Sequence, residues 1–313
     1  MGETFLHMER YNHLNQYLKE KFGNRTLKIC VDGDFTCPNR DGTKGKGGCI
    51  FCGSYGAGEN IKGKLGNAFD SIKNQVQTFL NSYRGERAEQ FIVYFQAFSG
   101  TYDDIKSLKA KYDTALSVSE KIIGLEIATR PDLINEEIVG LFKSYKEKYY
   151  VCVELGLQTA NEEIGEKINR CYTNEDFLKA SKMLKENDID FVAHLMVGLP
   201  DEKEEDIMET INLINSSGAK GIKIHNTYVL NNTMLGKLYL EGKYLPITQN
   251  YYVDMVAQIL KRLRPDIIIH RITADPPKDA FLAPEWAMHK KIVLNAIERK
   301  LKEENIYQGD LYK

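Results

Sequence analysis

Short apolar runs rich in strand-forming residues alternate with amphipathic helical patterns along most of this 313-residue chain. The runs have the length of strands, whereas the stretches between them repeat apolar residues with the helical period. Six strand–helix units in series predict an α/β fold with a parallel sheet, either an open doubly wound sheet or a barrel. The predicted strands are residues 27–32, 90–95, 122–127, 150–155, 191–197 and 221–226, and the predicted helices include 68–82, 135–146, 175–186 and 204–216.

The pattern changes after about residue 245. Two helical stretches, 248–264 and 284–304, flank one short strand candidate at 267–272, and no long linker precedes them. A chain of this length holds one barrel of roughly 200–250 residues and an appendage. We therefore predict two parts, residues 1–245 with an N-terminal helix and a C-terminal extension, 246–313, packed on the first part.

Composition narrows the class of protein. Hydrophobic residues make up 42% of the chain and charged residues 27%, which is typical of a globular protein with a full core. No apolar run approaches the roughly 20 residues that span a bilayer, and the start of the chain has no apolar signal-peptide region. These features predict a cytoplasmic protein away from membranes. The net charge of −2 lacks the basic excess of a dedicated nucleic-acid binder, although a local patch stays open.

Three of the six cysteines lie in one short glycine-rich segment, residues 37–52. In a reducing cytosol, clustered cysteines indicate metal binding or catalysis before disulfides. The segment follows the first predicted strand, and chemistry in parallel α/β folds collects at the carboxyl ends of strands. The clustered cysteines are Cys37, Cys49 and Cys52, and the scattered ones are Cys30, Cys152 and Cys171.

Two inorganic groups compete for these thiols. An iron–sulfur cluster is held by thiolates, and three of them on a four-iron cluster leave one iron open to bind a substrate. A closed zinc site needs four ligands, but the chain has one Cys-x-x-Cys pair and no histidine between His13 and His194. The fourth ligand would be Cys30, inside the first predicted strand. A zinc-stabilised binding module and an ordinary barrel lyase or hydrolase with incidental cysteines therefore remain as alternatives.

The three-cysteine segment after the first of six β/α units resembles the radical S-adenosylmethionine (SAM) superfamily. The usual family spacing is Cys-x3-Cys-x2-Cys, whereas here eleven residues separate Cys37 from Cys49, and the final pair keeps Phe51 before Cys52. This spacing, within CPNRDGT…GGCIFC, is similar to the YhcC-type subfamily, which is related to the radical half of the elongator tRNA-modifying enzyme. The resemblance runs from about residue 10 to the C-terminus.

The resemblance implies a partial (β/α)6 radical-SAM barrel with an α-rich C-terminal extension, and a [4Fe-4S] cluster on Cys37, Cys49 and Cys52. SAM would bind the open iron, and one electron would cleave it to methionine and a 5′-deoxyadenosyl radical that abstracts hydrogen from the substrate. An electron donor of the flavodoxin or ferredoxin type is implied. A tRNA base is the implied substrate, and the lysine-rich stretch 289–302 is the local basic patch that would meet RNA phosphate.

Further cofactor contacts are implied by position at the ends of the later strands. Gln158 matches a glutamine that contacts the nucleoside in porphyrinogen-oxidising relatives, and Arg170 stands where relatives place an arginine near the cofactor carboxylate. Simpler structural roles compete, such as helix capping by Gln158 and Thr129 or a surface ion pair of Arg170. The implied cofactor-binding residues are Gln96, Thr129, Gln158, Arg170, His194 and Gly198. Candidates on the substrate side, without assigned roles, are Glu126, Lys223, His225, Asn226, Tyr228 and Asp275.

Overall fold

A computed structural model describes residues 9–56, 58, 61 and 63–313 of the chain. Seven parallel strands form one sheet in the order β1-β2-β3-β4-β5-β6-β8. The six predicted strands are all present, which confirms the α/β prediction. The strands are β1 (Thr26–Val31), β2 (Gln90–Phe95), β3 (Ile122–Thr129), β4 (Tyr150–Gln158), β5 (Asp190–Val197), β6 (Gly221–Asn226) and β8 (Ile268–Arg271).

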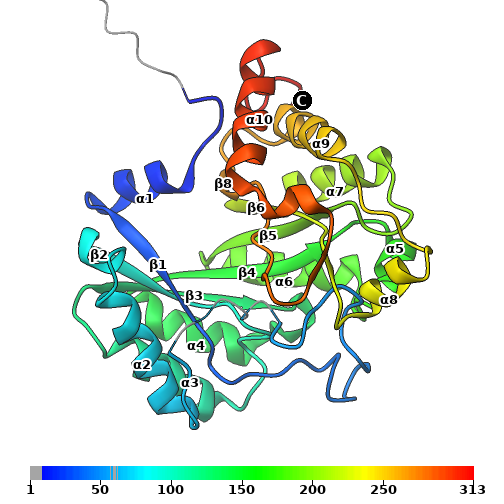
Figure 1. Ribbon diagram of the computed structural model, residues 1–313. Coiled ribbons are helices and arrows are strands. Elements are labelled where there is room, and N and C mark those ends of the chain that lie inside the picture. The colour runs from blue at the N-terminus through cyan, green and yellow to red at the C-terminus, as the bar shows by residue number, and fades with distance from the viewer. Residues whose placement is uncertain (1–8, 57, 59–60, 62) are drawn as a thin grey trace, which may run out of the picture.

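The seventh strand, β8, comes from the predicted C-terminal extension and pairs with β6, opposite Gly221 and Ile222. The two edge strands approach each other, because Lys28 Nζ on β1 lies 3.1 Å from His270 Nδ1 on β8. The sheet is therefore curled into a partial barrel (Figure 1). Because β8 lies in the predicted C-terminal extension and pairs within the sheet, this extension contributes a strand to the barrel. The division of the chain at residue 245 stays a prediction.

Helices cover the outer face of the curled sheet, with α9 and α10 side by side near the C-terminus (Figure 1). Several begin at a side-chain cap, which satisfies a free backbone N–H of the first turn. Asn67, Asp104, Asn135 and Thr173 accept such bonds. The longer helices are α2 (Ala68–Leu80), α3 (Ile105–Leu116), α4 (Glu136–Lys146), α6 (Asn174–Glu186), α7 (Glu204–Ser217), α9 (Gln249–Arg262) and α10 (Lys290–Glu303), and α1 (Leu14–Phe22) precedes the sheet.

The main apolar core lies between the sheet and these helices. Alternate residues of each strand, such as Ile29, Leu155 and Ile224, point outward into it and are fully buried. Because side chains alternate across a strand, the residues between them face the inside of the barrel. The outward-facing residues of the strands therefore form the apolar core with the helices, and the inward-facing residues form a separate inner surface.

A second apolar cluster ties the cysteine segment to distant parts of the chain. Ile50 N donates to Ile168 O at 3.0 Å, and Ile50 O accepts from Leu235 N at 2.8 Å. The cluster also takes in Val229 and Ala283. The elements around it are α5 (Glu162–Lys167), α8 (Met234–Leu240) and the antiparallel pair β7 (Val229–Leu230) and β9 (Phe281–Ala283).

The structure differs from the sequence prediction mainly at strand ends. The third and fourth strands end at Thr129 and Gln158, beyond the predicted ends at residues 127 and 155. Both of these residues still pair with the neighbouring strand. Of the described helices, none is long and apolar enough to cross a membrane. Residues 1–8, part of the stretch used to predict the absence of a signal peptide, lie outside the described residues.

Candidate active site

The cysteine segment forms a compact irregular loop after β1. Arg40 N donates to Cys37 O at 2.8 Å, and Cys52 N donates to Cys49 O at 2.9 Å. The Arg40 guanidinium spans the loop and donates to Cys52 O at 2.7 Å. Gly48 has a φ of 80° and lies against Arg40, so that a Cβ there would come within 2.9 Å of Arg40 Nε. The glycine thus allows Arg40 to hold the two ends of the cysteine segment together.

The three thiols gather at one place. Burial and the neighbouring sulfurs of Cys52 and Cys37 raise the pKa of Cys49 to about 12, which Arg130 partly opposes. Asn39 Nδ2 donates to Cys49 Sγ at 3.8 Å. Three thiolates this close repel one another unless a cationic group lies between them. The donor set is therefore that of a metal centre.

The number of thiols favours a cluster over a closed zinc site. A closed structural zinc site needs four protein ligands, whereas three thiols gather here. Three thiolates suffice for a four-iron cluster and leave one iron open. Cys37, Cys49 and Cys52 fit such a cluster.

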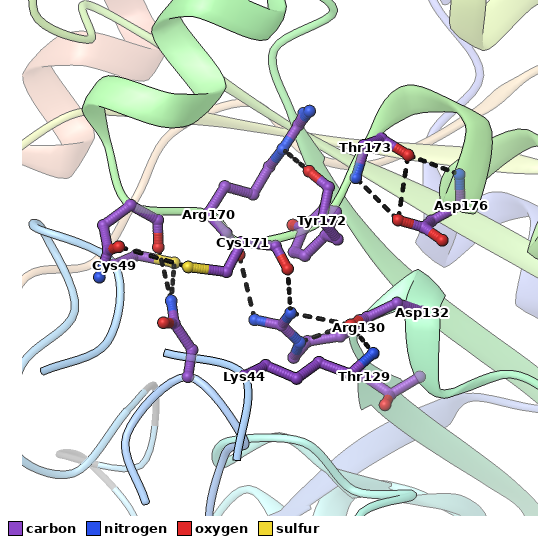
Figure 2. Close-up of polar contacts among 12 residues, drawn as sticks. Lys44, Cys49, Thr129, Arg130, Asp132, Arg170, Cys171, Tyr172, Thr173 and Asp176 are labelled. Atoms are coloured by element: carbon purple, nitrogen blue, oxygen red, sulfur yellow. Dashed lines mark hydrogen bonds and ion pairs between the residues drawn. The ribbon is translucent and has the colours of Figure 1, made fainter. Parts of the chain in front are cut away.

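The end of β3 is fastened to the loop after α5 through Arg130 (Figure 2). Its guanidinium makes a two-bond ion pair with Asp132, at 2.9 Å for both bonds, and donates to Arg170 O at 3.1 Å and Cys171 O at 2.9 Å. The ring of Tyr172 lies 4.8 Å from the guanidinium carbon. Arg130 therefore positions the polypeptide next to the cysteine segment, a role that the sequence analysis did not assign.

Arg170 is fully buried, so the alternative of a surface ion pair is wrong. Its Nη1 donates to the carbonyls of Leu157 and Thr159, and its Nε donates to Tyr172 O. Its Nη2 donates to Glu162, at 2.6 Å, and to an amide oxygen of α6. All five guanidinium N–H groups have protein acceptors, so in this arrangement Arg170 holds the end of β4 and has no donor left for a cofactor carboxylate.

The other implied cofactor contacts lie at the carboxyl ends of the strands. Gln158 has a φ of 70° at an irregularity in the pairing of β4 with β5. Its Nε2 and the hydroxyl of Tyr172 lie over Gly156. Gly198 has a φ of 91°, and its N–H donates to Glu202 at 2.7 Å.

Thr129 Oγ1 lies 2.6 Å from Thr101 Oγ1, and Gln96 directly follows β2. The helical segments that directly follow β3 and β4 begin at Pro131 and Glu162, and their N-caps are Arg130 and Asn161, so neither Thr129 nor Gln158 is a cap. The helix-capping alternative for these two residues is therefore wrong. Their contact with a cofactor, like that of Gln96 and Gly198, stays a prediction.

The inner surface of the barrel is built around the carboxylate of Glu154 on β4. Lys223 Nζ lies 2.5 Å from Glu154 Oε2, His194 Nε2 lies 2.9 Å from the same oxygen, and the hydroxyl of Tyr94 donates to it. Lys28 Nζ lies 3.3 Å from Oε1. Burial by itself would raise the pKa of Glu154, but the ammonium groups of Lys223 and Lys28 hold it well below its usual range, so Glu154 is ionised at neutral pH.

Glu126 on β3 is the second inner carboxylate. Lys28 Nζ lies 2.6 Å from it and 3.1 Å from His270, so an ammonium already lies between the acidic groups and the histidine. Burial raises the pKa of Glu126 to about 8. This side chain can therefore take up or release a proton near neutral pH.

Sequence reasoning singled out Glu126, Lys223 and His225, and the structure brings all three to the inner side of the barrel. It missed Lys28, Tyr94, Glu154 and His270. Strands of a parallel sheet that are buried on both faces are usually apolar throughout. Polar residues inside such strands, as at Lys28 and Glu154, were the signal that could have found these side chains.

Comparisons with known proteins agree with this geometry. A family model described as the Radical SAM superfamily matches residues 40–214, and a Radical_SAM C-terminal domain matches residues 219–303. Cys49 and Cys52 lie in the first matched region, and Cys37 lies just before it. The uncharacterized protein YtqA of Bacillus subtilis is 35% identical over 97% of this chain and 93% of its own length.

Partial matches point to the elongator proteins. Elongator complex protein 3 of Schizosaccharomyces pombe is 27% identical to this chain, and the match covers 68% of this chain and 39% of the elongator protein. The solved structure of archaeal Methanocaldococcus infernus Elp3 covers 90% of this chain and 64% of its own, at 16% identity with a TM-score of 0.65. At that identity, the structural match shows a shared fold.

Proposed function

This chain belongs to the radical SAM superfamily, and from that premise we propose that Cys37, Cys49 and Cys52 hold its cluster and that it modifies a base in tRNA. Enzymes of this family use a [4Fe-4S] cluster and SAM, and this chain is such an enzyme. When bound, these cofactors supply a 5′-deoxyadenosyl radical that abstracts hydrogen from a substrate carbon. The observation that carries the proposal is the gathering of three thiols next to a buried polar barrel interior.

The chain itself supplies positioning and shielding. Arg40 holds the cysteine segment closed, and Arg130 and Arg170 hold the loops beside it. In our proposal, Gln158 and His194 bind the nucleoside part of SAM. The left-handed backbone at Gly198 lets the adenine approach, and Gln96 and Thr129 mark the strand ends where its amino-acid part lies. Enclosure of the site protects a reactive radical from water.

Arg170 is the exception among the implied contacts. Because its five donors are bound to the protein, we propose that it acts through the end of β4 as a positioning residue. Glu154 and the residues around it would line the space for the substrate, since they occupy the inner surface below the strand ends.

The second part of the proposal is that the substrate is a base in tRNA. Its support is the similarity to Elongator complex protein 3 over 68% of this chain. The helix α10 adds lysines on an exposed surface, among them Lys291 and Lys302, which could neutralise RNA phosphates. Since the chain spans only part of the elongator protein, the reaction we propose is a radical modification without the rest of that protein.

Radical SAM enzymes need a reductant, and we propose that a flavodoxin or ferredoxin supplies the electron in the cytoplasm. Such partners are acidic and bind weakly, so their docking depends on ionic strength. An assay with chemically reduced flavodoxin in place of dithionite would test this part separately.

The first experiment is anaerobic reconstitution with iron and sulfide, followed by dithionite and SAM. We expect about four irons per chain and formation of 5′-deoxyadenosine. Both should be lost when Cys37, Cys49 and Cys52 are replaced by alanine. The matched control is Cys171→Ala, which removes an exposed thiol outside the proposed ligand set. Stoichiometric zinc without SAM cleavage would overturn the proposed cluster.

The substrate is tested with unmodified tRNA transcripts and with total tRNA from a strain lacking this gene. Nucleoside mass spectrometry should reveal a mass change in one base that needs both SAM and the three cysteines. If 5′-deoxyadenosine forms but no RNA changes mass, the radical chemistry stands and the tRNA substrate is wrong.

A further inference from the structure

One arginine on the inner surface has no counter-charge. Arg271 ends β8 and is partly buried. Within the part of the chain that the structure describes, its guanidinium makes no ion pair and no side-chain hydrogen bond. Its five N–H groups are oriented donors that match carboxylate and phosphate oxygens. A partly buried guanidinium without a protein partner is available to bind an anion.

The pairing of β6 with β8 directs Arg271 inward. The register shifts so that Ile222 pairs with Ile269 and Lys223 pairs with Arg271, which leaves His270 as an extra residue. Paired residues of neighbouring strands share a face, and Lys223 points to Glu154 inside the barrel. The bulge thus places Arg271 on the same side as Lys223, in the way that bulges re-aim side chains near sites.

The charges around Arg271 are unbalanced. Lys28, Lys223 and Arg271 are cations, while Glu154 is the one carboxylate held ionised by its partners and Glu126 has a pKa of about 8. Burial lowers the pKa values of Lys223, His194 and His225, and the positive charge of Arg271 adds to this lowering. At neutral pH this side of the interior therefore carries excess positive charge, which a bound anion would neutralise.

Two further polar groups, on β6 and directly after it, lack hydrogen-bond partners among the described residues. His225 Nε2 and Thr227 Oγ1 are buried and have no hydrogen bond among the described residues. His225 is two residues beyond Lys223 on β6, and its ring centroid lies 5.3 Å from that of His194, so it faces the interior. Thr227 N bonds to Val197 O and continues the strand pattern, which puts Thr227 on the same face.

Asn226 does not belong to this group. It lies on the opposite face of β6, where its side-chain oxygen accepts bonds from Thr273 and from Ala274 N at 2.8 Å. Its Nδ2 is also buried without a hydrogen bond among the described residues, but it lies on the other side of the strand from His225. The open polar groups on the Lys223 side of β6 are therefore His225 and Thr227, and Arg271 pairs opposite Lys223 on the neighbouring strand.

We propose that Arg271, His225 and Thr227 form an anchor for an oxyanion of the substrate, either a carboxylate or a phosphate. This anchor rests on the proposed function, because it assumes that the substrate enters the barrel interior. Arg271 donates two parallel bonds to the anion, and the imidazole and hydroxyl complete its coordination. The anchor fixes the substrate by its charged end, and Lys223 and Glu154 lie next to the bound molecule.

The test measures anion binding to the reconstituted enzyme by anaerobic equilibrium dialysis with labelled inorganic phosphate and, separately, labelled acetate. We expect one of the two anions to bind at one site per chain, and Arg271→Ala to weaken it at least tenfold. Arg271→Lys keeps the charge and should retain part of the binding. Arg299→Ala, which removes an exposed arginine of α10, is the matched control and should change nothing.

Two outcomes overturn the anchor. One is that each anion binds Arg271→Ala as tightly as it binds the wild-type enzyme, or that neither anion binds either protein. The other is a parallel loss of SAM affinity in Arg271→Ala, which would make Arg271 a contact of the cofactor carboxylate. A melting temperature of Arg271→Gln close to that of the wild type checks that the fold survives the loss of charge.

Failure of the anchor is distinguishable from failure of the proposed function. Substrate-free formation of 5′-deoxyadenosine depends on the cluster and SAM, and it is measured on the wild-type enzyme and on the control Arg299→Ala. If the wild-type enzyme forms no 5′-deoxyadenosine, the proposed function fails whatever the anions do. If it forms the product and no anion binds, only the anchor fails. If phosphate binds and acetate does not, the anchored group is a phosphate.

Discussion

Glu154 and Leu155 are neighbours on β4, yet they belong to chemically opposite regions of the molecule. Leu155 points outward into the helix-covered core and is fully buried among apolar side chains. Glu154 points inward and is equally buried, but its carboxylate contacts Lys223, His194 and Tyr94. Both side chains are shielded from water, and only the outer face of the sheet is apolar.

This difference separates stability from chemistry. The outer face gains free energy by removing apolar area from water. The inner face holds charges whose desolvation roughly cancels their attraction, so it adds little net stability. Such a costly arrangement is retained where polar groups are needed for binding or catalysis. The inner face is therefore where the substrate is expected.

The largest effect is expected from Glu154→Gln on the inner face. The substitution leaves Lys28 and Lys223 buried without their shared anion, which should lower the free energy of unfolding by about 3–5 kcal/mol. Urea unfolding of the anaerobic protein measures it. The control Glu209→Gln, on the exposed side of α7, should stay within about 0.5 kcal/mol. A loss below 1 kcal/mol for Glu154→Gln would show that water reaches the inner face.

Leu155→Ala tests the outer face one residue away. We expect a loss of about 2–5 kcal/mol from the cavity and the lost apolar burial. Formation of 5′-deoxyadenosine per folded molecule should be unchanged, because the side chain points away from the interior. Leu178→Ala, at a half-exposed position of α6, should cost much less. Loss of SAM cleavage in folded Leu155→Ala would contradict the division of roles between the faces.

Arg170→Lys is expected to have a moderate effect of about 2 kcal/mol, since a lysine cannot replace a guanidinium that bonds several carbonyls at once. The carbonyls of Leu157 and Thr159 would lose their donor. Urea unfolding and SAM affinity are measured together. Unchanged stability with weaker SAM binding would show instead that Arg170 contacts the cofactor.

The smallest effect, counted per pH unit, is the pH dependence that Glu126 contributes. Its pKa is about 8 in the folded protein against 4.5 in the unfolded chain, so the folded state binds the proton more tightly. Its stabilisation is complete below the unfolded pKa and is lost as pH rises from 4.5 through about 8, by at most about 1.4 kcal/mol per pH unit. Urea midpoints between pH 6 and 9 should fall less steeply for Glu126→Gln than for the wild type. Parallel profiles would contradict this.

The sequence was most informative where a pattern is local. The strands at 90–95 and 221–226 were predicted with their observed bounds, because alternation and flanking breakers mark them. The cysteine segment was found because its residues are close in sequence. The burial of Arg170 could not be predicted, since its acceptors lie on β4, α5 and α6 and no local pattern brings these together.

The sequence by itself therefore determined the β/α order, the two faces of each strand and the thiols that can hold a cluster, because these follow from spacing along the chain. Only the tertiary structure decided which inward side chains meet. Lys28 and His270 come from opposite edges of the sheet and lie 3.1 Å apart because the sheet curls. The bulge in β8 turns Arg271 inward, where none of the described side chains pairs with it. Curvature and register depend on contacts between distant segments, and these set the chemistry of the interior.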